Sequence, residues 1–236
     1  MAWNFGVQIN SLTGVDANLD SASEEGDDYT TLANQWLTDA AREVINILPP
    51  KLKQKCSKVT NLYIGNTDTT MDLDGVGEIL HVTRENANSG YYIGCREVSP
   101  LLADSANDST SLHYATATDP IYWTESNSSG NATLFVKPTP DSNQPAKVMH
   151  ISYPPNSTSW DGSNLPGNST SISNFPDEAE YLVVLRAAIT ATEYMMLFEE
   201  DAEVYAPQLQ TLKQDYQQGI AALRGGMAAP GAGGRQ

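Results

Sequence analysis

Cysteine is scarce in this chain of 236 residues, which contains only Cys56 and Cys95. Two cysteines are too few for a disulfide framework, so we expect both thiols to be reduced. Basic residues are also few, because 13 Lys and Arg stand against 29 Asp and Glu and give a net charge of -16. A protein that grips nucleic acid needs a basic surface that releases counterions from the phosphates. The composition therefore excludes a protein of that class.

Long hydrophobic runs are missing as well. No apolar stretch has the length that is needed to span a bilayer. The first residues, MAWNFGVQINSLTGV, also lack the basic region and apolar run of a signal peptide. We therefore expect no association with a membrane.

Catalytic and metal-binding motifs are absent from the sequence. The chain has three histidines and no HExxH, Cys-x-x-Cys, G-x-S-x-G, P-loop or dinucleotide fingerprint. The stretch MDLDGVGE places Asp72, Asp74 and Gly75 at the third, fifth and sixth positions of a calcium loop. His81 then falls at the twelfth position, where a carboxylate is needed. We predict a turn at this place, and a protein with no enzymatic activity, no metal and no cofactor.

Three helices are clearly marked. The first precedes Pro49 and Pro50 and repeats apolar residues at steps of three and four. The second follows a capping Asn174, has acidic residues in its first turn, and carries only Arg186 as a strongly polar side chain between residues 181 and 189. The third has a coiled-coil-like apolar stripe up to Leu223. We predict that these helices form one bundle.

The middle of the chain has a different pattern, in which short runs of residues that favour β-strands are separated by Gly, Asn, Asp and Pro. The predicted strands are VTNLYIG, EILHVTR, LHYATAT, IYWTE, ATLFVK and AKVMHISY. The predicted fold class is α+β: a helical bundle, made of an N-terminal helix and two C-terminal helices, with an inserted antiparallel β-sandwich or barrel-like domain. The predicted organisation is an extended N-terminal arm (1–27), the bundle (28–57 and 175–224), the β domain with its linker (58–174), and a flexible C-terminal tail (225–236).

Two sets of residues are candidates for contacts with other proteins. The second helix is apolar on nearly all sides, so we expect neighbouring copies of the chain to cover part of it. The subunit-packing candidates are Tyr181, Leu182, Leu185 and Ile189. The only basic cluster is either a solvated surface or a docking patch for an acidic partner. Its members are Lys51, Lys53, Lys55 and Lys58.

The order of several segments resembles the head–tail connector proteins, also called adaptor or neck proteins, of tailed bacteriophages. The resemblance spans residues 28 to 224 and is carried by AAREVINILPP, SLHYATATDPIYW, FVKPTP, HISYPP and FPDEAEYLVVLRAAITATEY. It implies a subunit that forms a ring, commonly of twelve copies, beneath the portal protein of the capsid. The expected partners are other copies of the chain, the portal protein and downstream neck or tail proteins, and genomic DNA passes without sequence-specific binding. The expected location is the neck of the virion, after assembly in the host cytoplasm.

Two alternatives share parts of this pattern. A tail or fibre module that binds host glycans would use exposed aromatic rings as platforms for sugars, and the candidates are Tyr122, Trp123 and Trp160. Another ring of the neck, or a tail-terminator ring, would obey the same physical constraints as an adaptor. Only the position in the particle separates that ring from an adaptor.

Overall fold

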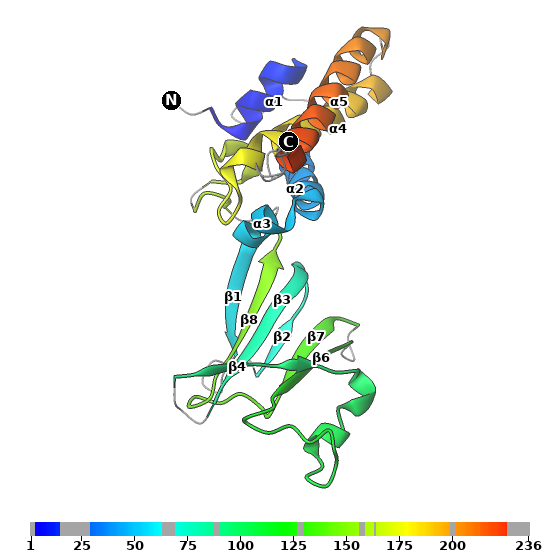
Figure 1. The fold of residues 1–236 in the computed structure, drawn as a ribbon. Coiled ribbons are helices and arrows are strands. Elements are labelled where there is room, and N and C mark those ends of the chain that lie inside the picture. Colours follow the sequence, from blue (N-terminus) through cyan, green and yellow to red (C-terminus); the bar gives the residue numbers. More distant parts are fainter. Residues whose placement is uncertain are drawn as a thin grey trace, which may run out of the picture. The chain divides into compact units, whose positions relative to one another are not determined.

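The computed structural model describes residues 3–14, 29–62, 69–86, 90–126, 130–155, 159–162, 164–198 and 202–225. The chain divides into two compact units. The helical unit comprises Met1–Cys56 and Tyr153–Gln236, and the β unit comprises Ser57–Ser152. Figure 1 shows that the labelled α-helices belong to the helical unit and the strands to the β unit. The described residues therefore have an α+β fold, as predicted.

Helix α1 (Phe5–Thr13) lies within the predicted extended arm, and the prediction is wrong for these residues. The Asn4 side chain accepts a hydrogen bond of 2.8 Å from the backbone N–H of Val7, and so caps the helix. Gly14 ends it in the left-handed conformation, with φ +72°. Phe5 and Ile9 are buried, so the helix is held by packing. The rest of the arm, residues 15–27, lies outside the described residues.

Helix α2 (Tyr29–Ile47) is the predicted N-terminal helix. Its buried face repeats at helical spacing and consists of Ala33, Trp36, Leu37, Ala40, Ala41, Val44 and Ile45. Pro50 then opens the short helix α3 (Pro50–Lys53), which continues into the 3₁₀ turn η1 (Gln54–Cys56). Proline is well suited to this first helical position, because its missing N–H would have no partner there.

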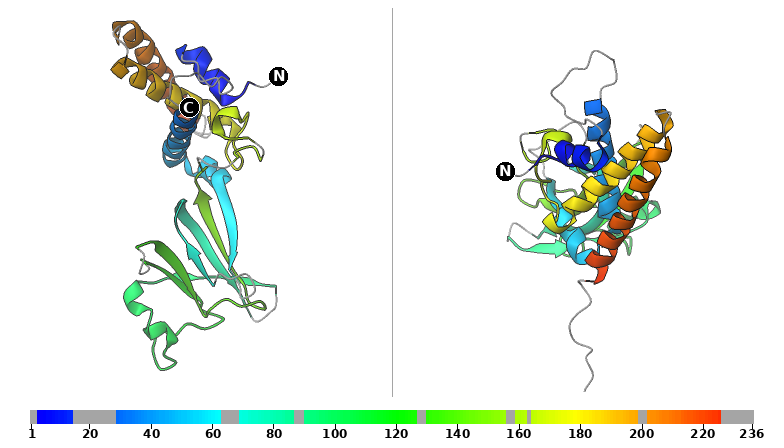
Figure 2. Two further views of the ribbon diagram at one scale, coloured as in Figure 1. Left: turned by 180° about the vertical axis from the view of Figure 1, so that it is seen from behind. Right: turned by 90° about the horizontal axis from the view of Figure 1, so that it is seen from above.

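Helix α4 (Asp177–Phe198) is the central element of the helical unit. It packs against α1, α2 and the last helix, α5 (Ala202–Gly225). Figure 2 shows α4 and α5 running side by side. Gly219 permits the close approach of these two helices, because a Cβ atom at this position would collide with Cδ2 of Leu182. The predicted C-terminal tail begins at Gly225, the last residue of α5, and its remainder lies outside the described residues.

The segment between the β unit and α4 was predicted to be a linker, but it packs within the helical unit. Trp160 is buried against Phe5, with ring centroids 6.0 Å apart in an edge-on arrangement. The backbone N–H of Gly167, in the 3₁₀ turn η4 (Pro166–Asn168), donates a 2.8 Å hydrogen bond to Oδ1 of the buried Asn34. A run rich in Ser, Asn and Gly is therefore ordered by one large aromatic residue and by backbone hydrogen bonds.

The described residues of the β unit form two four-stranded sheets. The first sheet has the order β1-β8-β3-β4 and is antiparallel throughout. The second has the order β2-β7-β6-β5, and its β5–β6 pair is parallel, so the prediction of a purely antiparallel domain is wrong at this edge. The strands are β1 (Ser57–Leu62), β2 (Thr70–Asp72), β3 (Val76–Glu85), β4 (Tyr92–Gly94), β5 (Arg96–Glu97), β6 (Ile121–Ser126), β7 (Ala132–Lys137) and β8 (Ala146–Ser152).

Apolar side chains from the facing sides of the two sheets form one cluster. The first sheet contributes Leu62, Val82, Ala146 and Val148, and the second contributes Met71, Leu134 and Val136. The opposite side of the second sheet is covered by residues 98–120, which we call the outer loop and which contains the 3₁₀ turns η2 (Pro100–Leu102) and η3 (Ser105–Asn107). Ala106 and Ala115 of this loop pack on Ile121 and Trp123. The predicted strand at LHYATAT is wrong, because residues 112–118 contain two turns and only an isolated bridge from Thr116 to Asp119.

Substitution of Gly219 tests the contact between α4 and α5. Gly219→Val would overpack the site next to the buried Leu182, and we expect it to lower the free energy of unfolding by about 1–3 kcal/mol. Gln218→Val is the matched control, because Gln218 is the exposed neighbour on the same helix. Urea unfolding curves of both variants provide the comparison. Equal stability of the two would show that α5 does not approach α4 closely here.

Two carboxylates in the first turn of α4 predict opposite effects of pH. Burial raises the pKa of Glu180, whose Oε1 accepts a 2.7 Å hydrogen bond from the N–H of Ile172. Its charged form therefore opposes folding above the raised pKa, and this cost disappears as the pH falls below the unfolded value of 4.5. Hydrogen bonds from the backbone and Lys55 lower the pKa of Glu178, so its contribution is favourable above 4.5 and is lost as the pH falls through the lowered pKa.

We therefore expect Glu180→Gln to raise stability at pH 7 and Glu178→Gln to lower it. Both differences from the unsubstituted chain should vanish in acid, where the two carboxyl groups are protonated in the folded and unfolded states alike. Thermal unfolding between pH 3 and pH 7 measures the two trends. Trends of the same sign would contradict this assignment of the two environments.

Candidate functional site

The predicted docking lysines fall in two different units. Lys51 and Lys53 belong to α3 and Lys55 to η1, so a stretch of five residues in the helical unit holds all three. Nζ of Lys55 lies 3.0 Å from Oε1 of Glu178, and both side chains are about half exposed. An exposed ion pair of this kind contributes little to stability. Lys58 lies on β1, so it belongs to the β unit and not to the unit that holds the other three lysines.

Three of the four subunit-packing candidates are buried inside the chain itself. Leu182, Leu185 and Ile189 are each at most 3% exposed, because α1, α2 and α5 surround α4. These side chains are therefore not available to a neighbouring copy, and the expectation that other copies must cover the helix is wrong for this face. The physical reason is that three elements of the same chain already cover it. Tyr181 is 54% exposed and remains a candidate for an external contact.

A charged network joins three helices and was not predicted. Nε of Arg186 on α4 lies 2.7 Å from Oε2 of Glu43 on α2, and the hydroxyl of Tyr216 on α5 donates to the other oxygen of Glu43 at 3.2 Å. Burial, followed by the charge of Glu43, raises the pKa of Tyr216, so this phenol remains protonated and donating. Lys213 of α5 pairs with Glu193 of α4 at 2.8 Å nearby. The sequence feature that could have pointed to this network is Arg186, the only charged residue between residues 181 and 189.

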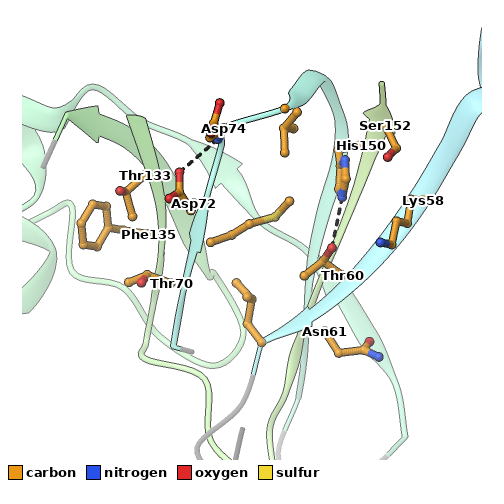
Figure 3. A pocket seen from close by; sticks show the side chains of 14 residues that line it. Lys58, Thr60, Asn61, Thr70, Asp72, Asp74, Thr133, Phe135, His150 and Ser152 are labelled. Carbon is orange, nitrogen blue, oxygen red and sulfur yellow. Dashed lines mark hydrogen bonds between the residues drawn. The ribbon is translucent and has the colours of Figure 1, made fainter. Parts of the chain in front are cut away.

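The β unit contains a cavity of about 670 Å³ between its sheets, drawn in Figure 3. His150 lines it and is buried, and its Nδ1 donates to the backbone oxygen of Ile151 at 3.1 Å. Its Nε2 lies 3.1 Å from the hydroxyl oxygen of Thr60. Both ring nitrogens are therefore engaged by the protein. The geometry fixes the ring in place and leaves neither nitrogen for proton transfer to a ligand.

Across the same cavity, Asp72 and Asp74 form the predicted turn. Oδ1 of Asp72 accepts a 3.0 Å hydrogen bond from the N–H of Asp74, and Gly75 follows with φ +68°. Figure 3 shows both carboxylates on the opposite side of the cavity from His150. Within the described ranges, no group of three or more His, Cys, Asp or Glu side chains is arranged to hold a metal ion.

The aromatic residues of the glycan alternative do not form exposed platforms. Trp123 is 5% exposed and stacks on Phe135 with ring centroids 5.4 Å apart, and Trp160 is 2% exposed. Tyr122 is half-buried, and its hydroxyl donates to Glu97 at 3.2 Å. Burial, with the nearby Glu97 charge, raises the pKa of Tyr122 to about 12. These rings serve the core, so the geometry does not favour sugar stacking on them.

The two cysteines are free thiols. Burial raises the pKa of Cys56 to about 11 and that of Cys95 to about 12, so both thiols are protonated at neutral pH and react slowly. None of the helices in the described part of the chain is long and apolar enough to cross a membrane.

Comparison with known protein families identifies the class of this chain. No curated protein matches the chain. A sequence profile of the family described as SU10 adaptor protein matches residues 12–235, which is nearly the whole chain. The protein therefore belongs to the SU10 adaptor protein family and is a structural adaptor protein of tailed bacteriophages.

Proposed function

We propose that the chain forms a ring beneath the portal protein, extends the DNA channel and joins the capsid to the tail. The observation that carries this proposal is the family match over residues 12–235. The ring commonly has twelve copies in proteins that the sequence resembles, and the virion neck is the corresponding location. The proposed partners are other copies of the chain, the portal protein and downstream neck or tail proteins.

The charge of the chain supports passage of DNA through such a ring. A net charge of -16 leaves few cations for phosphate contacts, and phosphate contacts are the main source of non-specific binding to DNA. An acidic wall repels the duplex and lets it slide. The proposed role of the protein towards DNA is therefore that of a conduit, with no binding of a particular sequence.

The helical unit supports a role as the rigid part of the ring. α4 is covered by three helices and is tied to α2 and α5 through Glu43, Arg186 and Tyr216. We propose that this bundle frames the channel and that Lys51 and Lys53 dock on an acidic surface of the portal protein. The C-terminal tail, residues 225–236, is proposed as a second contact with the portal.

The copy number in the particle tests the ring. We expect quantitative mass spectrometry of purified virions to give about one copy of this protein per copy of the portal protein, because one contact repeated around two stacked rings pairs each subunit of one ring with one subunit of the other. A ratio of several to one would indicate decoration of the capsid or tail. Absence from the particle would overturn the proposal.

Charge reversal tests the docking lysines. We expect Lys51→Glu combined with Lys53→Glu to weaken binding to purified portal protein roughly tenfold, and the difference should shrink at high salt, because the proposed contact is electrostatic. Arg42→Glu together with Lys137→Glu changes the charge equally outside this stretch and is the matched control. Equal loss of binding in both double variants would remove the specific role of Lys51 and Lys53.

A further inference from the structure

Helix α5 is held to the helical unit by few buried side chains. Among its described residues, only Leu212 and Tyr216 are buried, with exposed fractions of 4% and 5%. The neighbouring α4 buries apolar side chains in every turn from Ala179 to Ala191. Figure 2 shows α5 at the edge of the unit, with α4 between α5 and α1. Residue for residue, α5 is therefore stabilised less by burial than α4.

The contact between α5 and its neighbours is also polar and incompletely filled. A cavity of about 260 Å³ lies between α5 and the helices α2 and α4. The side chains around this cavity have lost packing partners on one side, which weakens the contact. The ion pair of Lys213 with Glu193 is about half exposed and contributes little. The lining residues are Glu43, Arg186, Ile189, Glu193, Lys213, Tyr216 and Gln217.

The helix is interrupted just before the part that makes these contacts. Pro207 lies inside α5 and has no N–H to donate to the carbonyl oxygen of Glu203. Glu203, Val204 and Ala206 are exposed. The residues that bind or pack on the rest of the unit follow the proline, and they are Gln208, Leu212, Lys213, Tyr216 and Gly219.

Separation of α5 leaves the charges beneath it paired. Oε2 of Glu43 keeps its 2.7 Å contact with Nε of Arg186, and Nη1 of Arg186 keeps its 2.9 Å hydrogen bond to the hydroxyl of Thr190. Only the hydrogen bond from Tyr216 to Glu43 is lost from this network. The high cost of a buried charge without a partner therefore does not arise.

We infer that residues 208–225, which we call the latch, open from α4 as one unit while α1, α2 and α4 stay folded. Pro207 is the pivot of this motion. The closed latch covers Leu182, which lies against Gly219, and Ile189, which lines the cavity. Opening uncovers both side chains, so the chain has a second form with an apolar strip along α4. This step belongs to the free chain and does not rest on the proposed ring.

Hydrogen exchange of the full-length chain, followed by mass spectrometry of its peptides, tests the opening. We expect the amides of the latch to exchange roughly tenfold faster than those of residues 182–191 in α4, and at one common rate along the latch. Equal protection of the two helices would overturn the inference. Rates that rise steadily towards Gly225 would also overturn it, because they would show fraying from the end of the helix.

A reversible lock provides the matched control. A Cβ atom at position 219 would lie 3.6 Å from Cγ of Leu182, so cysteines at the two positions are within reach of a disulfide. In the variant Leu182→Cys with Gly219→Cys, oxidation should slow exchange of the latch roughly tenfold, to the rate of α4, and reduction of the same sample should restore it. Exchange of the latch that the disulfide leaves unchanged would overturn the inference.

Two further samples complete the test. Gly219→Cys alone, oxidised in parallel, measures the background from Cys56 and Cys95, which react slowly because their pKa values are raised. Slow exchange of α4 in the reduced double variant shows that this variant is folded. If it is not folded, the exchange pattern of the unsubstituted chain decides the question alone.

Discussion

Helix α4 is apolar on nearly every side, and a helix of that kind is stable in water only where neighbours cover it. In this protein α1, α2 and α5 supply the cover. The position of each of these helices follows from that requirement: α1 is capped and held by Phe5 and Ile9, and α5 approaches closely because Gly219 has no side chain. The helical unit is thus organised around the desolvation of one helix.

The same requirement explains the charged network in an otherwise apolar bundle. Arg186 lies on the central helix with its side chain 29% exposed, and a close partner offsets the partial removal of its charge from water. Glu43 supplies that partner and in turn accepts the Tyr216 hydroxyl. Since the three residues come from three helices, the network also favours one relative rotation of those helices over others. Apolar packing alone specifies such a register less strictly.

The periodic features of the sequence predicted the larger elements well. Helix α2 and helix α4 were expected from their apolar spacing and terminal signals, and most strands from short β-type runs. Helix α1 was missed although Asn4 and Gly14 are ordinary cap residues, because nine residues are too few for a clear period. The strand at LHYATAT was wrong because residues that favour strands also occur in a loop, which here packs one residue of this segment, Ala115, on the sheet.

The candidate site was harder to predict for a different reason. The sequence indicates that Leu182, Leu185 and Ile189 are buried away from water. It does not show whether the same chain or another copy buries them. The lysines posed a similar difficulty, since Glu178 is 123 residues from Lys55 in sequence and adjacent to it in space. The exposed leucines of the outer loop could not be predicted either, because the exposure of Leu101 and Leu112 depends on which residues cover the second sheet.

The pairing of β1 with β8 has a consequence for how the protein is built. Ser57, at the start of the β unit, is opposite Ile151, next to its end. The chain therefore enters and leaves the unit on neighbouring strands, and the two junctions with the helical unit are side by side. A module attached in this way can be exchanged for another of different sequence or size without a change in the path of the host chain, since the gap to be closed stays that of two adjacent strands. Evolution can thus alter the module while the helices keep their arrangement.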